Sequence, residues 1–111
     1  MATAARSHVR DLITSEVIAA YQRDGAVLVK GALSAEELEW LEVGLEETRD
    51  NPSEMFSNYG GTGGDGATVV DQFPSLRFPS LHRLMEKGPV AELAGRVMQV
   101  PSTQLILDQV F

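Results

Sequence analysis

The residues of this chain best suited to metal chemistry are its two histidines, His8 and His82. Metal sites built from histidine and carboxylate ligands need several such side chains to converge. Neither histidine here is followed two positions later by aspartate or glutamate. We therefore assign no metal ligand and no catalytic residue in this span, and we expect His82 to have a surface or helix-packing role on a short helix.

A glycine-rich stretch, residues 58–66, contains the spacing G-x-G-x-x-G at Gly61, Gly63 and Gly66. In dinucleotide-binding proteins this spacing follows a strand and opens a helix, so that the pyrophosphate meets the helix N-terminus. Here the glycines follow a polar stretch and lead into a β-branched run. We therefore interpret the stretch as a loop, with a lid over a ligand as the alternative, because long loops in compact domains are often functional.

Other catalytic patterns do not occur in the sequence. No serine stands in a G-x-S-x-G elbow, the strand-to-helix turn that exposes a nucleophile. The adjacent carboxylates of Glu36-Glu37 and Glu46-Glu47 are typical of a solvated helix face.

Length, charge and cysteine content restrict the class of protein. With 111 residues and 43% apolar content, the chain can form at most one ordinary domain with a modest core. The absence of cysteine excludes disulfides and thiolate metal sites and favours a cytoplasmic location. A net charge of -7 disfavours nucleic acids and anionic membranes as partners. Residues 1–13 show no continuous apolar run, so we expect a loose terminus and neither a signal peptide nor a membrane span.

The sequence of the first half of the chain predicts a helix, then a strand, then a second helix. Thr14 or Ser15 can cap the first helix, and Gly25 can close it in the left-handed conformation. Residues 26–29 are apolar and partly β-branched, which predicts a short buried strand. Ser34 and Asn51-Pro52 then bracket a helix over residues 35–50, because serine favours the N-cap and the residue before proline leaves the α region.

The expected helix over residues 35–50 is amphipathic. Leu38, Leu41 and Leu45 recur on one stripe, with Trp40 and Val43 beside it. The glutamates of this helix lie mostly outside the stripe. We therefore expect the leucine stripe to lie on a larger structure.

The second half predicts a strand near residue 70, two short helices and a final strand. Ser80 can cap a helix that Gly88 ends, and Pro89 suits the first turn of the next. Residues 103–111 alternate weakly, which predicts a strand with Leu107, Gln109 and Phe111 on a common face.

Several of these features occur together in a known family. Tyr21, Asp24-Gly25, the apolar run and the Lys30 to Ser34 turn before a glutamate-rich helix resemble the N-terminus of the phytanoyl-CoA dioxygenase family of iron(II)- and 2-oxoglutarate-dependent oxygenases. Residues 81–84, 88–94 and 105–111 are similar to the approach to that family's iron site. The resemblance covers nearly the whole chain in order, and it rests on spacing and turn residues.

The resemblance implies an α+β fold in which residues 14–111 are the N-terminal portion of a single oxygenase domain. Its helices and few strands would buttress a double-stranded β-helix (jelly roll), most of which is absent from this span. The intact polypeptide would hydroxylate a small-molecule substrate with Fe(II) and 2-oxoglutarate. The iron ligands would lie beyond Phe111, and the span alone would be inactive and bind neither cofactor.

The resemblance also implies one candidate site residue. In the family, the last strand before the iron motif turns alternate side chains into the barrel, so Gln109 would face substrate or co-substrate. The other interpretation of Gln109 is an edge residue that bonds to the backbone. Asp108 is expected to be structural.

A second hypothesis belongs to another class of protein. The chain would be a free-standing acidic helical module without enzymatic activity, which binds a protein partner through the Trp40 and Leu45 side of the helix over residues 35–50.

Overall fold

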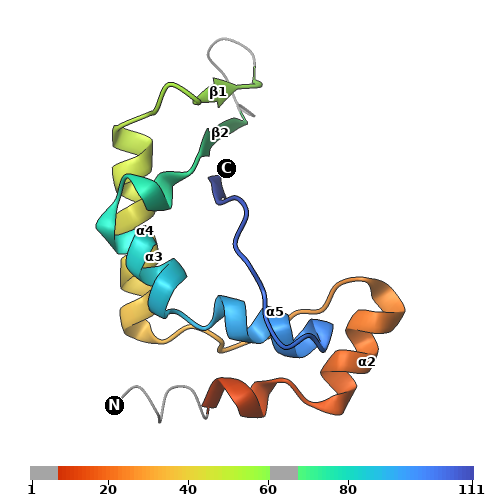
Figure 1. Ribbon diagram of the computed structural model, residues 1–111. Coiled ribbons are helices and arrows are strands. Elements are labelled where there is room, and N and C mark those ends of the chain that lie inside the picture. The colour runs from red at the N-terminus through yellow and green to blue at the C-terminus, as the bar shows by residue number, and fades with distance from the viewer. Residues whose placement is uncertain (1–7, 61–67) are drawn as a thin grey trace. The chain divides into compact units, whose positions relative to one another are not determined.

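The computed structural model describes residues 8–60 and 68–111, which form helices and a small antiparallel sheet (Figure 1). This is the α+β class that we expect from the sequence. The chain divides into two compact units, Met1–Ser34 with Gly88–Gln104 and Ala35–Lys87 with Leu105–Phe111. The G-x-G-x-x-G pattern falls within residues 61–67, outside the described residues.

The first unit contains helix α2 (Ser15–Asp24) and helix α5 (Val90–Met98), which contact each other. The hydroxyl of Thr14 accepts a hydrogen bond of 3.3 Å from the backbone N–H of Val17, so Thr14 caps α2 as predicted. Gly25 ends α2 with φ of 75°, and its N–H donates to the carbonyl of Tyr21. The two predicted ends of this helix are therefore confirmed.

Residues 8–12, within the stretch that we expect to be loose, form a helical turn in which Val9 is buried. The guanidinium Nε of Arg10 donates to Oε1 of Glu92 on α5 at 3.0 Å, and Arg96 donates to the same oxygen at 3.3 Å. The hydrogen bond from Arg10 and the one from Arg96 lower the pKa of Glu92, despite an opposing contribution from desolvation. The acidic side chain of Glu92 therefore ties the N-terminal turn to α5.

The strand that we predict over residues 26–29 is absent, and these residues form neither helix nor strand. Leu28 is 77% exposed. The prediction was wrong because an apolar run specifies a strand only where a neighbouring strand supplies hydrogen bonds, and none of the described residues does so.

The second unit is built on helices α3 (Ala35–Asp50) and α4 (Pro79–Lys87), which lie side by side (Figure 1). The bounds of α3 agree with the prediction. Helix α4 begins at Pro79, so Ser80 lies inside it and is not the N-cap that we expect.

The face of α3 that packs against α4 differs from the predicted leucine stripe. Gly44 and Thr48 are buried, whereas Leu38 is 45% exposed and Leu45 is 39% exposed. A Cβ atom added at Gly44 would lie 2.2 Å from Cγ of Leu81, so the missing side chain makes room for this leucine of α4. Periodicity finds the apolar side of a helix, but the partner's shape selects the face that is buried.

The antiparallel sheet has the order β1 (Ser57–Asn58), β2 (Val69–Gln72), β3 (Gln109–Val110). In β2 and β3 the opposed residues are Asp71 with Val110 and Gln72 with Gln109. The predicted strand over residues 103–111 is therefore reduced to two residues, because only these find a partner strand among the described residues.

A 3-10 helix, η1 (Pro74–Leu76), links β2 to α4. Oδ2 of Asp108 accepts a hydrogen bond of 2.8 Å from the N–H of Ser75, and its carbonyl accepts one of 2.8 Å from the N–H of Phe73. Asp108 thus has a structural role, which holds the start of η1 against the strand at the chain's end.

Candidate functional site

The buried carboxylate of Asp71, on β2, binds groups from the segment after α3 and from the segment after β2. Its side chain is 4% exposed. The backbone N–H of Ser53 donates to Oδ2 at 2.8 Å, and the hydroxyl of Ser53 donates to Oδ1. The N–H of Gln72 donates to Oδ1 at 2.9 Å, and Arg77 lies 3.4 Å from Oδ2.

These partners determine the ionisation of Asp71. Desolvation by burial opposes the charged form, but the hydrogen bonds from Ser53 and Gln72 and the charge of Arg77 outweigh it and lower the pKa of Asp71. The guanidinium of Arg77 also donates to the carbonyl of Asn51. All these partners hold the carboxylate in place, so Asp71 is a structural anion with both oxygens occupied.

A groove lies between α3 and one face of the sheet, with a volume of about 420 Å³. Its wall is mainly apolar, and Asp71, Thr48, Glu46 and Arg49 add the polar groups. The apolar lining residues are Leu45, Phe56, Val69, Val110 and Phe111. Phe111 therefore lies on the side of Val110, not on the face that it was predicted to share with Gln109.

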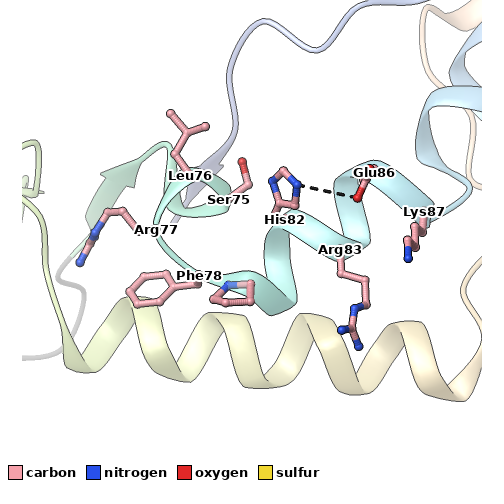
Figure 2. A pocket seen from close by; sticks show the side chains of 9 residues that line it. Ser75, Leu76, Arg77, Phe78, His82, Arg83, Glu86 and Lys87 are labelled. Atoms are coloured by element: carbon pink, nitrogen blue, oxygen red, sulfur yellow. Dashed lines mark ion pairs between the residues drawn. The ribbon is translucent and has the colours of Figure 1, made fainter.

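A second depression, of about 410 Å³, runs along η1 and α4 (Figure 2). Arg77, His82, Arg83 and Lys87 line it together with Glu86. Figure 2 shows His82 and Glu86 pointing toward each other, whereas Arg77, Arg83 and Lys87 point in different directions. The depression therefore carries three basic side chains that do not converge on one point.

The individual contacts around this depression fit ordinary surface roles. Nε2 of His82 lies 3.8 Å from Oε2 of Glu86, one helical turn away on α4. The guanidinium of Arg83 lies 5.5 Å from the ring centroid of Trp40 on α3, within the range of a cation–π contact. His82 thus lies exposed on a helix, as its sequence context predicts.

The predicted site residue, Gln109, lies on β3 with an exposed side chain. It stands opposite Gln72 on β2, a residue that sequence reasoning did not single out. The groove against α3 is lined by the neighbouring residues Asp71 and Val110, and not by these two glutamines.

His8 and His82 belong to different units. Within residues 8–60 and 68–111, no three histidine, cysteine, aspartate or glutamate side chains gather closely enough to hold a metal ion. The helices of this same part of the chain are each too short or too polar to traverse a bilayer.

Sequence reasoning missed Asp71, Ser53 and Arg77. One signal was available for Asp71, because a carboxylate directly after two valines in a predicted strand must find partners if it is buried. Nothing in the sequence indicates that Ser53 and Arg77, on either side of the glycine-rich stretch, supply them.

Comparison with known proteins gives no relatives: no family model, no curated protein and no solved structure matches this chain.

Proposed function

We propose that this chain is the N-terminal, supporting part of an iron(II)- and 2-oxoglutarate-dependent oxygenase similar to the phytanoyl-CoA dioxygenase family. The basis for naming the family is the resemblance in residues 21–41, 81–84, 88–94 and 105–111. In this proposal the chain supports a catalytic barrel, and residues that follow Phe111 supply the iron ligands. The intact enzyme hydroxylates a small molecule, while 2-oxoglutarate is converted to succinate and carbon dioxide.

The observation that carries the supporting role is the apolar surface that the described residues leave exposed. In the second unit, Ile106 is 88% exposed and Phe111 80%, and in the first unit, taken by itself, Leu28 is 77% exposed. In the described part of the chain, the buried hydrophobic residues are only Val9, Leu81 and Leu84. Large exposed apolar surfaces commonly mark interfaces with further structure, so this surface supports a role as one layer of a larger fold.

The sheet supports the same proposal. Helix α3 lies against the face that carries Asp71 and Val110, where the two elements line a common groove. In a domain built from packed layers, each element buries its apolar face against a further element. A barrel sheet packed on the opposite face would complete such an arrangement.

The test compares the native polypeptide that carries this chain with residues 1–111 alone. With Fe(II), 2-oxoglutarate and oxygen, the native polypeptide is expected to form succinate, and residues 1–111 alone are expected to form none. A His-x-Asp or His-x-Glu motif shortly after Phe111 in the native reading frame is expected as well. Succinate formation by residues 1–111, or a native polypeptide that forms none, would contradict the proposal.

A second candidate function is favoured by the exposed leucines of α3. Leu38, Leu45 and Val43 are each between 39% and 45% exposed on a helix that is otherwise strongly acidic. We propose as the alternative that α3 binds a protein partner and that no enzyme is involved. This alternative gains if residues 1–111 fold cooperatively, remain monomeric, and lose binding to the partner when Leu45 is changed to glutamine.

A further inference from the structure

The groove between α3 and the sheet has the size and composition of a small-molecule site. Its volume of about 420 Å³ lies within the range of about 300–1,000 Å³ that is typical of ligand pockets, which are mostly apolar with a few polar groups. All of its lining residues belong to the second unit and to the described part of the chain. The groove is therefore formed within a single unit.

The apolar wall of the groove keeps surface that a ligand can cover. Phe56 is 43% exposed, Leu45 39% and Val69 37%. Apolar surface that passes from water into contact with other apolar groups stabilises the contact. The wall therefore favours a ligand with an apolar body.

The charged residues that line the groove determine which polar group such a ligand carries. Both carboxylate oxygens of Asp71 accept hydrogen bonds, and Arg77 pairs with this side chain. Nε of Arg49 donates to Oδ1 of Asp50 at 3.1 Å. Glu46 makes no hydrogen bond and no ion pair with another group in residues 8–60 or 68–111. The uncompensated charge at the groove is therefore negative.

A protonated amine complements this charge. An ammonium group carries a positive charge and three N–H donors, so it can pair with the carboxylate of Glu46. The faces of aromatic rings also attract cations, and Phe56 and Phe111 line the same groove. An anionic ligand would compete with Asp50 for Arg49 and would lie close to Glu46, which is three positions away on the same helix. The groove therefore selects a cation.

We propose that this groove binds a small molecule with an apolar body and one protonated amine. The body lies against the apolar wall, which includes Leu45, Phe56 and Val69, and the ammonium group pairs with the exposed Glu46. This inference goes beyond the proposed function, because no iron ligand and no 2-oxoglutarate takes part in the site.

The test is a titration of the native polypeptide that carries this chain, with its leucine and valine methyl groups labelled with ¹³C. Phenethylamine is the probe, and phenethyl alcohol and phenylacetate are its neutral and anionic counterparts of similar size. Phenethylamine is expected to shift the methyl signals of Leu45, Val69 and Val110 until they saturate. Leu28, which is exposed in the first unit, is the internal control and is expected not to shift.

The order of affinity tests the charge. Phenethylamine is expected to bind about two- to fivefold more tightly than phenethyl alcohol, because an ion pair with an exposed carboxylate contributes modestly. Phenylacetate is expected to bind more weakly than the alcohol. The preference for the amine should decrease as salt is added, because salt screens exposed charges.

Substitutions separate the head group from the body. Glu46→Gln is expected to remove the preference for the amine over the alcohol. Glu39→Gln is the matched control and is expected to retain it, because Glu39 is an exposed glutamate of α3 that does not line the groove. Phe56→Ala is expected to weaken the binding of all three probes about threefold or more, because it removes part of the apolar wall. Leu45→Ala takes its place if the backbone signals show that Phe56→Ala is not folded.

Four results would overturn the proposal. Shifts of the same size at Leu28 would show that the probes bind to any exposed apolar group, and the absence of shifts at the groove would show that it is filled. Equal affinity for amine and alcohol, or tightest binding of phenylacetate, would exclude a cation site. An equal loss of preference in Glu39→Gln and Glu46→Gln would assign the selection to the net charge of the helix and not to Glu46.

Discussion

At the scale of single residues, Asp71 shows how one buried charge can hold distant parts of a chain together. Ser53 lies before the glycine-rich stretch and Gln72 after it, and both donate hydrogen bonds to this carboxylate. Hydrogen bonds to a charged group are stronger than neutral ones. The carboxylate therefore holds Ser53, which follows α3, against β2.

Replacement of Asp71 by asparagine is expected to lower the free energy of unfolding by about 1–3 kcal/mol at neutral pH, because a buried hydrogen-bonding site loses its anionic acceptor. Chemical denaturation of the two proteins measures the difference. Asp50→Asn is the matched control, because Asp50 is 63% exposed and pairs with the adjacent Arg49. An equal loss in both variants would show that burial of the carboxylate is not the cause.

The pH dependence of this difference has a definite sign. The folded-state pKa of Asp71 lies below its ordinary value of 3.8, since the hydrogen bonds and Arg77 prevail over desolvation. Its contribution to stability is therefore fully present above that value and is lost as the pH falls through the folded-state pKa. Unfolding curves of wild type and Asp71→Asn are expected to converge as the pH falls below 3.8, and a difference that stays constant well below pH 3.8 would contradict the expectation.

At the scale of elements, the contact between α3 and α4 depends on the absence of a side chain at Gly44. Gly44→Ala would place a Cβ atom 2.2 Å from Leu81. The cost of overpacking is about 1–3 kcal/mol, and it is expected to exceed the gain in helix propensity of about 1 kcal/mol. The melting temperature should fall.

Two further variants test whether the clash with Leu81 causes the loss of stability in Gly44→Ala. Gly95→Ala makes the same change inside α5, where the nearest atom would be 3.5 Å away, and is expected to stabilise by about 0.5–1 kcal/mol. In a double-mutant cycle, Leu81→Ala should reduce the penalty of Gly44→Ala, because it removes the atoms that clash. Strictly additive effects would exclude a direct contact.

The end of α2 provides a test of backbone conformation that is independent of packing. Gly25 has φ of 75°, and a Cβ there would meet no atom within 4 Å. Gly25→Ala is expected to cost about 1–2 kcal/mol from the left-handed conformation alone. Gly25→Asn should cost less, because asparagine tolerates this region, and equal losses measured by thermal unfolding would argue against this cause.

The elements differ in how far the sequence predicts them. The bounds of α3 follow from Ser34 and Asn51-Pro52, because helix ends depend on local capping and steric effects. The strand expected over residues 26–29 was wrong because pairing depends on distant residues. Gln109 was nominated through the family resemblance and the alternation of the last strand, whereas its opposite residue, Gln72, follows only from the register of β2 and β3.

At the scale of the whole molecule, exposed apolar surface is the dominant property. Residues 1–111 alone are expected to bind a hydrophobic dye and to associate with rising concentration, because Ile106 and Phe111 are exposed. Ile106→Ser and Phe111→Ser should reduce both effects, with changes in unfolding free energy within about 0.5 kcal/mol. Dye fluorescence and light scattering measure the outcome.

The control for these substitutions is Leu84→Ser, because Leu84 is 3% exposed. This variant is expected to lose stability and to bind more dye, since it places a hydroxyl in the core. If Ile106→Ser and Phe111→Ser behave in the same way, their side chains are buried in solution and the supporting role proposed for the chain loses its main observation.

The bond between Ser75 and Asp108 spans 33 positions of the chain, and this separation has a consequence for synthesis on the ribosome. At a translation rate of about 5–20 residues per second, Asp108 is added roughly 2–7 s after Ser75. Helices α3 and α4 precede Asp108 in the chain, so both are synthesised before η1 can complete its hydrogen bonds. The contact between η1 and the final strand is therefore the last of these contacts to become possible.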